Sequence, residues 1–447
     1  MTIRTRFAPS PTGYIHVGNA RAALFCWMFA RRHGGEFMLR LDDTDTERSE
    51  QKYADAIEAD LEWLGLNVDL REKQSERFGR YDEVFETLKS RGLVYPCYET
   101  PDELDLKRKR QLSRGLPPVY DRAALALDDA QRAALEADGK KAHWRFKLSG
   151  NVVVWEDLIR GTQRIETASL SDPVLVRGDG SYLYTLPSVI DDHDFAVTHV
   201  VRGEDHVTNT ATQVEIFEAI GASIPEFAHF SLLQSADGGG LSKRLGALSI
   251  GDLREMGLEA MSINSLIARL GTADTIEPFS DLSELFQGFD FSRLGRAPAR
   301  LDVEELKRLN KKILQSMPFE IAGPRIQALG FEIRADFWDV VRGNLSRLDD
   351  AITFAKIIQG SVQPIIGDDD AEFVAQALAE LPDGPWTETT WSEWTSNLKA
   401  KTERKGKTLF MPLRLALTGS EHGPEMQNLL PLIGEEKTRQ RLSGAAG

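Results

Sequence analysis

The chain has 447 residues, which is long for one hydrophobic core and predicts two to four domains. The hydrophobic share is 41%, and no apolar run is long enough to cross a bilayer, which argues against a membrane partner. The chain has two cysteines, and so low a number is typical of proteins in a reducing cytoplasm. The net charge of −15 argues by itself against nucleic acid, yet basic stretches at residues 107–114, 307–312 and 399–407 could contact phosphate.

The first elements follow the order strand, helix, strand. Residues 2–7 read as a strand, residues 18–33 as a helix that Gly34 ends, and residues 36–45 as a strand ending in acids. This βαβ order predicts a parallel sheet covered by helices. Between the first two elements, prolines stiffen a turn over residues 8–15. The turn brings His16 to a helix N-terminus, which is a ready site for phosphate.

The remaining pattern changes twice along the chain. Helical spacing continues over residues 49–65 and 80–92, and residues 93–185 then mix a basic helix with short β-like stretches, which indicates an insertion. The α/β pattern returns as a strand, a helix, a strand and a loop at residues 194–205, 207–221, 227–233 and 234–246. From residue 247 onward only helical periodicity is found, so we predict an all-α C-terminal half.

Charged side chains follow three of the predicted strands. In a parallel sheet, ligands bind beyond the carboxyl ends of the strands, and a mixture of guanidinium and carboxylate groups there suits a zwitterion with an extra carboxylate. The alternative is a surface salt-bridge cluster. The groups concerned are Arg6, Arg40 and Arg202 with Asp42, Asp43 and Asp45.

Two further stretches could carry chemistry. The glycine-rich loop over residues 238–246 would let Lys243 and Arg244 close over a polyanion, although it lacks the spacing of a P-loop. A protein-bound metal is a weaker alternative, since no HExxH motif accompanies the acidic and histidine-rich run. That run contains Asp191, Asp192, His193, Asp194, His199 and His206.

Several motifs together resemble one enzyme family. "PSPTGYIHVGN" at residues 9–19 and "LSKRLG" at residues 241–246 resemble the HIGH and KMSKS signatures of class I aminoacyl-tRNA synthetases. With "RLDDTD" at residues 40–45, "YTLPSVIDDHDFAVTHVVRGEDHVTNT" at residues 184–210 and "KGKTLFMPLRLALTGSEHGPE" at residues 405–425, the chain is similar to bacterial glutamyl-tRNA synthetases over nearly its whole length.

The resemblance implies a role for each matching residue. His16 and Lys243 would be catalytic, with His16 at the ATP phosphates and Lys243 stabilising the pentacovalent α-phosphate and the leaving pyrophosphate. The implied ATP-binding residues are Ser10, His16, Gly18, Asn19, Ser242, Lys243 and Arg244. The implied glutamate-binding residues are Arg6, Ser10, Asp42, Tyr184, Ser188 and Arg202. Among these, an arginine would pair with the side-chain carboxylate of glutamate.

Some positions depart from the family pattern. Asp42 stands where glutamate is common, Ser188 where asparagine is common, and Gly240 replaces the first lysine of KMSKS. Glu99 and Tyr120 stand where some members have zinc-binding cysteines, so we expect no zinc and no protein-bound metal.

The implied reaction joins L-glutamate to ATP, with Mg²⁺ on the phosphates, and passes the acyl group from glutamyl-adenylate to the terminal adenosine of tRNA(Glu). Whether tRNA(Gln) is also charged stays open, and we expect a cytoplasmic monomer. The implied architecture is a Rossmann-like α/β catalytic domain (residues 1–95 and 185–243), an α+β acceptor-end insertion (96–184), a helical stem-contact domain (244–315) and a helical anticodon-binding domain (316–447).

Other functions are disfavoured by the helical second half. A glutaminyl enzyme of this superfamily would be expected to end in β-barrels, and the base-modifying relative lacks an anticodon domain. A small-molecule nucleotidyltransferase would not need roughly 200 helical residues after the catalytic loop. A non-catalytic tRNA-binding protein would not need His16 and Lys243.

Overall fold

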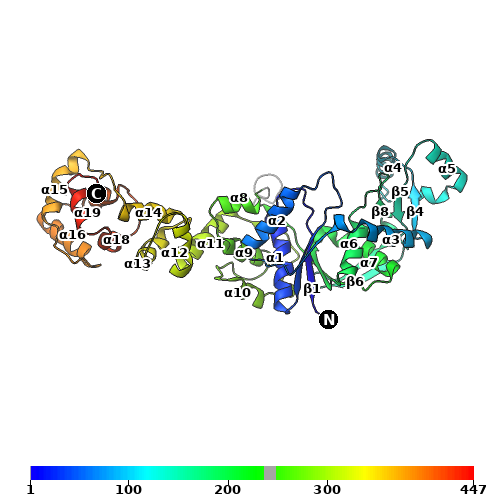
Figure 1. Ribbon diagram of the computed structural model, residues 1–447, viewed down its shortest axis with the longest axis horizontal. Coiled ribbons are helices and arrows are strands. Elements are labelled where there is room, and N and C mark those ends of the chain that lie inside the picture. The colour runs from blue at the N-terminus through cyan, green and yellow to red at the C-terminus, as the bar shows by residue number, and fades with distance from the viewer. Residues whose placement is uncertain (1, 236–247) are drawn as a thin grey trace. The chain divides into compact units, whose positions relative to one another are not determined.

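The computed structural model describes residues 2–235 and 248–447, which fold as two compact units (Figure 1). The first unit comprises Met1–Glu255 with Ile263–Val303, and the second comprises Met256–Ser262 with Glu304–Gly447. Within the described ranges, every strand belongs to the first unit, and no helix has the length and apolar character to span a membrane.

The predicted βαβ unit is confirmed. Strands β1 (Arg4–Phe7) and β2 (Glu36–Leu41) pair in parallel, with α1 (Val17–Arg32) between them in sequence and against β1 in space (Figure 1). Helix α1 buries Ala20, Leu24 and Met28, which recur every four residues and so share one face. The residues between β1 and α1 form the predicted turn.

The main sheet has seven strands in the order β3-β2-β1-β9-β10-β6-β7, and its pairs are parallel except for β6 with β7. The parallel arrangement brings the carboxyl ends of β1, β9 and β10 to one edge. The strands not yet bounded are β3 (Leu70–Lys73), β6 (Val152–Asp157), β7 (Gly161–Glu166), β9 (His199–Gly203) and β10 (Glu226–Phe230).

Helices of the first unit cover this sheet. A buried apolar cluster joins three of them to the strands through residues such as Tyr81, Leu186, Phe217 and Phe227. The three helices are α3 (Phe78–Ser90), α6 (Thr185–Asp194) and α7 (Val207–Ile220). The first unit also contains α2 (Gln51–Trp63), α8 (Ile250–Glu255) and α10 (Leu282–Gln287), while α9 (Ala260–Arg269) has residues in both units. The sequence analysis does not predict helix α6, although its buried Leu186, Val189 and Ile190 follow a helical i, i+3, i+4 spacing.

The insertion differs from its expected extent. An antiparallel sheet of β4 (Val94–Cys97), β5 (His143–Phe146) and β8 (Val174–Val176) accompanies α4 (Pro101–Ser113) and α5 (Asp129–Ala137). Strands β6 and β7 lie in the same stretch of sequence but extend the main sheet, where Asp157 of β6 pairs with Phe227 of β10. Val153 and Trp155 bury one face of β6, so residues 152–166 contribute to the main sheet as well.

A short strand corrects the expectation that no strand follows residue 247. Strand β12 (Ala299–Leu301) pairs in parallel with β11 (Leu233–Ser235), which directly precedes residues 236–247. Three residues are too few to show an alternating pattern, so sequence periodicity misses such a strand.

The second unit contains two apolar clusters. One includes Leu314, Trp338 and Ala355, and the other includes Phe373, Trp394 and Leu442. The predicted boundary at residues 315 and 316 falls inside α11, whereas the units part near residue 303. The helices are α11 (Val303–Ser316), α12 (Phe319–Ala328), α13 (Ala335–Val341), α14 (Asp350–Gln359), α15 (Ala371–Ala379), α16 (Thr390–Lys401), α17 (Lys407–Thr418), α18 (Met426–Ile433) and α19 (Glu435–Leu442).

Candidate active site

A cavity of about 830 Å³ opens where the carboxyl ends of β1 and β9 meet the N-terminus of α1. This is the position at which parallel sheets bind ligands. Most of the expected site residues line it, and they come from five separate stretches of the chain. The expected residues on the wall are Arg6, Ser10, His16, Gly18, Asn19, Asp42, Tyr184 and Arg202.

His16 caps α1 and faces the cavity. Its Nδ1 accepts a hydrogen bond from the backbone N–H of Gly18 at 3.0 Å, and the Asn19 side chain accepts from the His16 backbone at 3.1 Å. Burial lowers the pKa of His16, which keeps the ring neutral. Because Nδ1 accepts, the ring proton is on Nε2, so His16 can donate one hydrogen bond to a phosphate oxygen.

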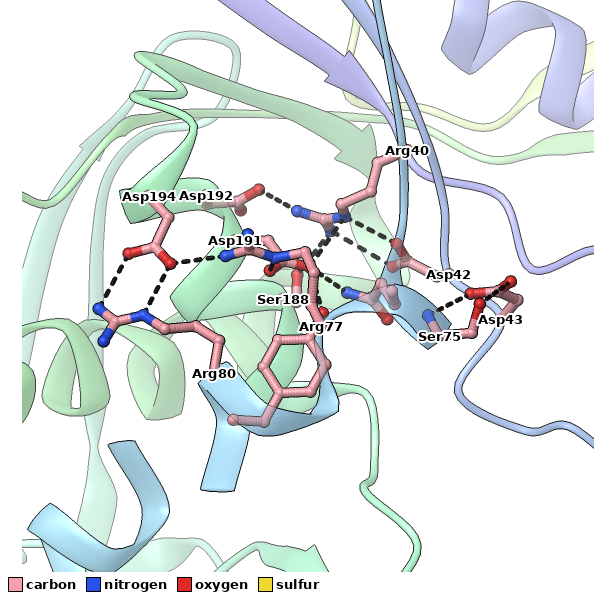
Figure 2. Close-up of polar contacts among 12 residues, drawn as sticks. Arg40, Asp42, Asp43, Ser75, Arg77, Arg80, Ser188, Asp191, Asp192 and Asp194 are labelled. Atoms are coloured by element: carbon pink, nitrogen blue, oxygen red, sulfur yellow. Dashed lines mark hydrogen bonds and ion pairs between the residues drawn. The ribbon is translucent and has the colours of Figure 1, made fainter. Parts of the chain in front are cut away.

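Buried ion pairs support the carboxyl groups on one side of the cavity. Arg40 donates from Nε to Asp42 at 2.7 Å and from Nη1 to Asp192 at 2.7 Å (Figure 2). Asp192 also accepts from Arg6 at 3.0 Å. Although burial opposes ionisation, the charges of Arg6 and Arg40 lower the pKa of Asp192. Burial outweighs the same effect at Asp42 and raises its pKa to about 6. Asp42 is therefore a carboxyl group on the cavity wall with a pKa of about 6.

The network continues from the cavity toward the surface along α6. Arg77 donates to Asp191 at 2.7 Å and to Asp194 at 2.5 Å, and Arg80 donates to Asp194 at 2.9 Å (Figure 2). The aspartates that suggested a metal alternative thus bind arginine and are not gathered with histidine. Arg40 is the cation at the centre of this cluster.

Arg202 is a buried cation whose hydrogen-bond partners are neutral. Its Nε donates to His229 Nε2 at 3.1 Å, Nη1 donates to the Tyr184 hydroxyl at 2.9 Å, and Nη2 donates to Thr210 Oγ1 at 2.7 Å. Burial lowers the pKa of Arg202 from its ordinary value, since a charged guanidinium is costly without an anion. Its free N–H groups could therefore bind an anionic ligand.

The carboxylates next to Arg202 in sequence have other partners. Glu204 pairs with Arg160 at 2.7 Å, and Asp205 lies 3.7 Å from His206. In the part of the chain that the structure describes, no carboxylate forms an ion pair with Arg202. The alternative of a surface salt-bridge cluster is therefore wrong for Arg202 among the described residues.

Besides Arg40, three other expected groups do not line the cavity. The resemblance implies that Ser188 contacts glutamate. In the structure Ser188 is fully buried behind the cavity wall, where its hydroxyl accepts from Arg40 at 3.2 Å. Asp43 accepts from Ser75 at 2.7 Å, and Asp45 pairs with Arg48 at 2.6 Å. Gly240, Ser242, Lys243 and Arg244 lie outside the described residues.

The structure adds Arg21, which the sequence reasoning missed, to the cavity wall. Asp205 and His206 also line the cavity, and His206 belongs to the run considered above for a metal. Arg21 is buried in α1 and donates to the backbone carbonyls of Ser231 at 2.6 Å and Leu270 at 2.8 Å. Burial lowers its pKa to about 10. The one available signal is a charged residue inside the otherwise apolar run of residues 20–30.

A second cluster of possible ligands lies in the insertion. Cys97, Glu99 and His143 each offer an atom within 4.8 Å of the others. Burial raises the pKa of the Cys97 thiol to about 11, and Glu99 already accepts from Tyr120 at 2.8 Å and from Lys107 at 3.2 Å. The expected absence of zinc stays a prediction.

Comparison with known proteins assigns the family. Residues 2–308 match tRNA synthetases class I (E and Q), catalytic domain, and residues 365–446 match an anticodon binding domain. Glutamate–tRNA ligase 1 of Maricaulis maris is 56% identical, covering 99% of both chains, and glutamate–tRNA ligase 2 of Methylorubrum populi is 55% identical, covering 98% of both. The crystal structure of a glutamate tRNA ligase from Elizabethkingia meningosepticum in complex with its amino acid superposes with a TM-score of 0.85 at 28% identity, covering 99% of both chains. This chain therefore belongs to the glutamate–tRNA ligases within the class I aminoacyl-tRNA synthetases.

Proposed function

We propose that the cavity binds L-glutamate with its side-chain carboxylate on Arg202. The observation that carries this proposal is the buried guanidinium of Arg202, which has neutral partners and N–H groups left for an anion. A carboxylate there would form a charge-assisted pair and would offset the cost of burying the cation. Glutamine has a neutral side-chain amide, which would not offset the cost of burying the Arg202 cation.

The other charged groups of the wall would hold the amino-acid end. Asp42, when ionised, would accept the substrate ammonium, and Arg6 would contribute positive potential for the α-carboxylate that attacks ATP. Asp192 fixes Arg6, and Arg40 fixes Asp42, so both groups are held before the substrate arrives. Positioned charges of this kind are a large part of catalysis by an enzyme that forms no covalent bond with its substrate.

ATP would enter over α1. The helix N-terminus and the Nε2–H of His16 would face its phosphates, and Lys243 would stabilise the departing pyrophosphate. Mg²⁺ would come bound to the phosphates and would reduce their charge. Asp205, exposed on the cavity wall, is a carboxylate that could ligate it. Acyl transfer from the adenylate to the terminal ribose would follow.

We also propose that the second unit binds tRNA(Glu) and that the chain acts as a cytoplasmic monomer. The anticodon-domain match at residues 365–446 supports the tRNA contact, and it coincides with the apolar cluster from Phe373 to Leu442. The insertion would hold the acceptor end, and residues 244–315 would contact the stem. Aminoacylation of purified tRNA(Glu) and tRNA(Gln) would show whether one or both are charged.

Replacement of Arg202 by alanine tests the glutamate site. We expect the KM for glutamate in tRNA-dependent pyrophosphate exchange to rise by on the order of 10- to 100-fold, because a buried charge-assisted pair is lost. The KM for ATP should change less than about threefold. Arg160→Ala is the matched control, since Arg160 pairs with Glu204 and does not line the cavity.

A melting curve for each variant separates binding from folding. If Arg202→Ala raises both KM values alike, or binds glutamate normally once folded, then Arg202 is structural and the proposed glutamate site is wrong.

A further inference from the structure

Two buried residues lie directly behind Arg202, and the proposed function gives them no part. His229 on β10 and Asp157 at the end of β6 are both buried, and neither lines the cavity. We infer that Asp157 and His229 are positioning residues that orient Arg202 for the substrate side-chain carboxylate without neutralising its charge. This inference rests on the proposed role of Arg202.

The contacts determine where the histidine proton lies. Arg202 Nε can only donate, so His229 Nε2, 3.1 Å away, must accept and carry no proton. The ring proton is therefore on Nδ1, which donates to Asp157 Oδ2 at 2.5 Å. Burial lowers the pKa of His229, and the hydrogen bond from His229 lowers the pKa of Asp157 although burial opposes this. Asp157 is thus an ionised carboxylate, His229 a neutral imidazole and Arg202 a guanidinium cation, joined in that order by hydrogen bonds.

Asp157 is itself held in place by backbone groups. Its Oδ1 accepts the backbone N–H of His229 at 3.2 Å, of Ile159 at 3.0 Å and of Arg160 at 2.9 Å. These donors stabilise the negative charge and fix the direction of Oδ2. The carboxylate therefore sets the tautomer and the ring orientation of His229, and the ring sets the direction of Arg202 Nε.

The neutral ring between the two charges has a specific consequence. A carboxylate in direct contact with Arg202 would orient it equally well, but it would also satisfy the cation and compete with the substrate carboxylate. Imidazole supplies an acceptor without a charge, so the attraction of Arg202 for an anion is kept. The specificity of the cavity thus depends on β6, a strand from the stretch of sequence predicted as an insertion.

Three substitutions of His229 test this inference. His229→Gln keeps a neutral acceptor, and we expect its KM for glutamate to stay within about threefold of the parent value. His229→Leu removes the acceptor and should raise that KM by about tenfold or more. His229→Glu has the shape of the glutamine variant but adds a charge, and it should raise the KM at least as much as leucine. The kcat and the KM for ATP should change by less than about twofold in all three.

Controls separate positioning from packing. His199→Leu alters another buried histidine, on the neighbouring strand and outside the cavity wall, and should leave the KM for glutamate unchanged. If His229→Leu unfolds below the assay temperature, the glutamine and glutamate variants decide the question, because they differ only in charge.

Equal KM values for glutamate in the glutamine and glutamate variants would overturn the inference, as would a normal KM in a folded leucine variant. Either result would leave the proposed function standing if Arg202→Ala still raises the KM for glutamate. A normal KM in Arg202→Ala would overturn both.

Discussion

His16 combines a structural and a chemical task in one side chain. The ring accepts from the backbone N–H of Gly18 and so satisfies one of the unpaired N–H groups at the start of α1. This contact needs glycine, because a Cβ at residue 18 would lie 2.9 Å from Cε1 of the ring and 3.0 Å from Nδ1. The glycine of the "HVGN" stretch is therefore required by the position of the histidine.

Gly18→Ala should displace the His16 ring. We expect kcat in pyrophosphate exchange to fall by about tenfold or more, since a small misplacement of a catalytic group is costly. The KM for glutamate should change little. Gly79→Ala, where an added Cβ meets nothing within 4 Å, is the matched control. Steady-state kinetics on both variants checks this, and a normal kcat in Gly18→Ala would show that the ring position does not matter for catalysis.

The raised pKa of Asp42 predicts that kcat/KM for glutamate depends on pH. Its pKa, raised to about 6 by burial, means that the carboxyl is charged above that pH and neutral below it. If Asp42 accepts the substrate ammonium, kcat/KM for glutamate should fall as the pH drops through about 6, because the neutral carboxyl attracts the ammonium less. A pH profile at saturating ATP and tRNA measures this. Asp42→Asn should give a lower, flatter profile in the same range, and an unchanged fall would assign the titration to another group.

At the scale of elements, one arginine joins β2 to α6. Arg40 of β2 pairs with Asp192 of α6 and with Asp42 just beyond its own strand, and its side chain is 0% exposed. The far end of the same network is Arg80 of α3, whose side chain is 42% exposed (Figure 2). Arg40 and Arg80 therefore differ in burial, a difference that the sequence alone does not show.

Arg40→Met should cost about 3–5 kcal/mol of unfolding free energy, because it leaves two buried carboxylates without their shared partner. Arg80→Met should cost about 1 kcal/mol or less, since solvent screens an exposed pair. Denaturant unfolding of both variants compares them directly. Equal losses would mean that burial does not set the strength of this network.

At the scale of the whole molecule, an acidic chain must bind a polyanion. The net charge of −15 repels tRNA at long range, so contact has to rely on local basic patches. In the second unit, residues 399–407 contain two exposed lysines, Lys405 just before α17 and Lys407 at its first position. These lysines are candidates for phosphate contact.

The KM for tRNA(Glu) should therefore depend on salt more strongly than the KM for glutamate. We expect a rise of about tenfold or more between about 50 and about 200 mM KCl, because phosphate contacts release counterions. Buried charges around glutamate are screened much less. The Lys405→Ala, Lys407→Ala double variant should reduce the slope of log KM against log salt. An unchanged slope would place the phosphate contacts elsewhere.

The sequence by itself determined the βαβ unit, the turn before α1 and the approach of Arg6, His16, Asp42 and Arg202 to one cavity. Prolines and glycines define turns through their own backbone limits, and apolar spacing defines a helix within a few turns. Parallel strands then bring their carboxyl ends to one edge, so residues that follow different strands meet there. These rules need no knowledge of distant contacts.

Only the tertiary structure decided which charged groups face the ligand and which are buried behind it. Arg40, expected at the cavity, lies beneath it with Ser188, 148 residues away in sequence, and His229 supports Arg202 from a neighbouring strand. Strand β6 joins the main sheet although the surrounding sequence forms a separate one. Such outcomes depend on side-chain partners far apart in the chain, because a buried charge must find a counter-charge or hydrogen-bond partner wherever packing supplies one.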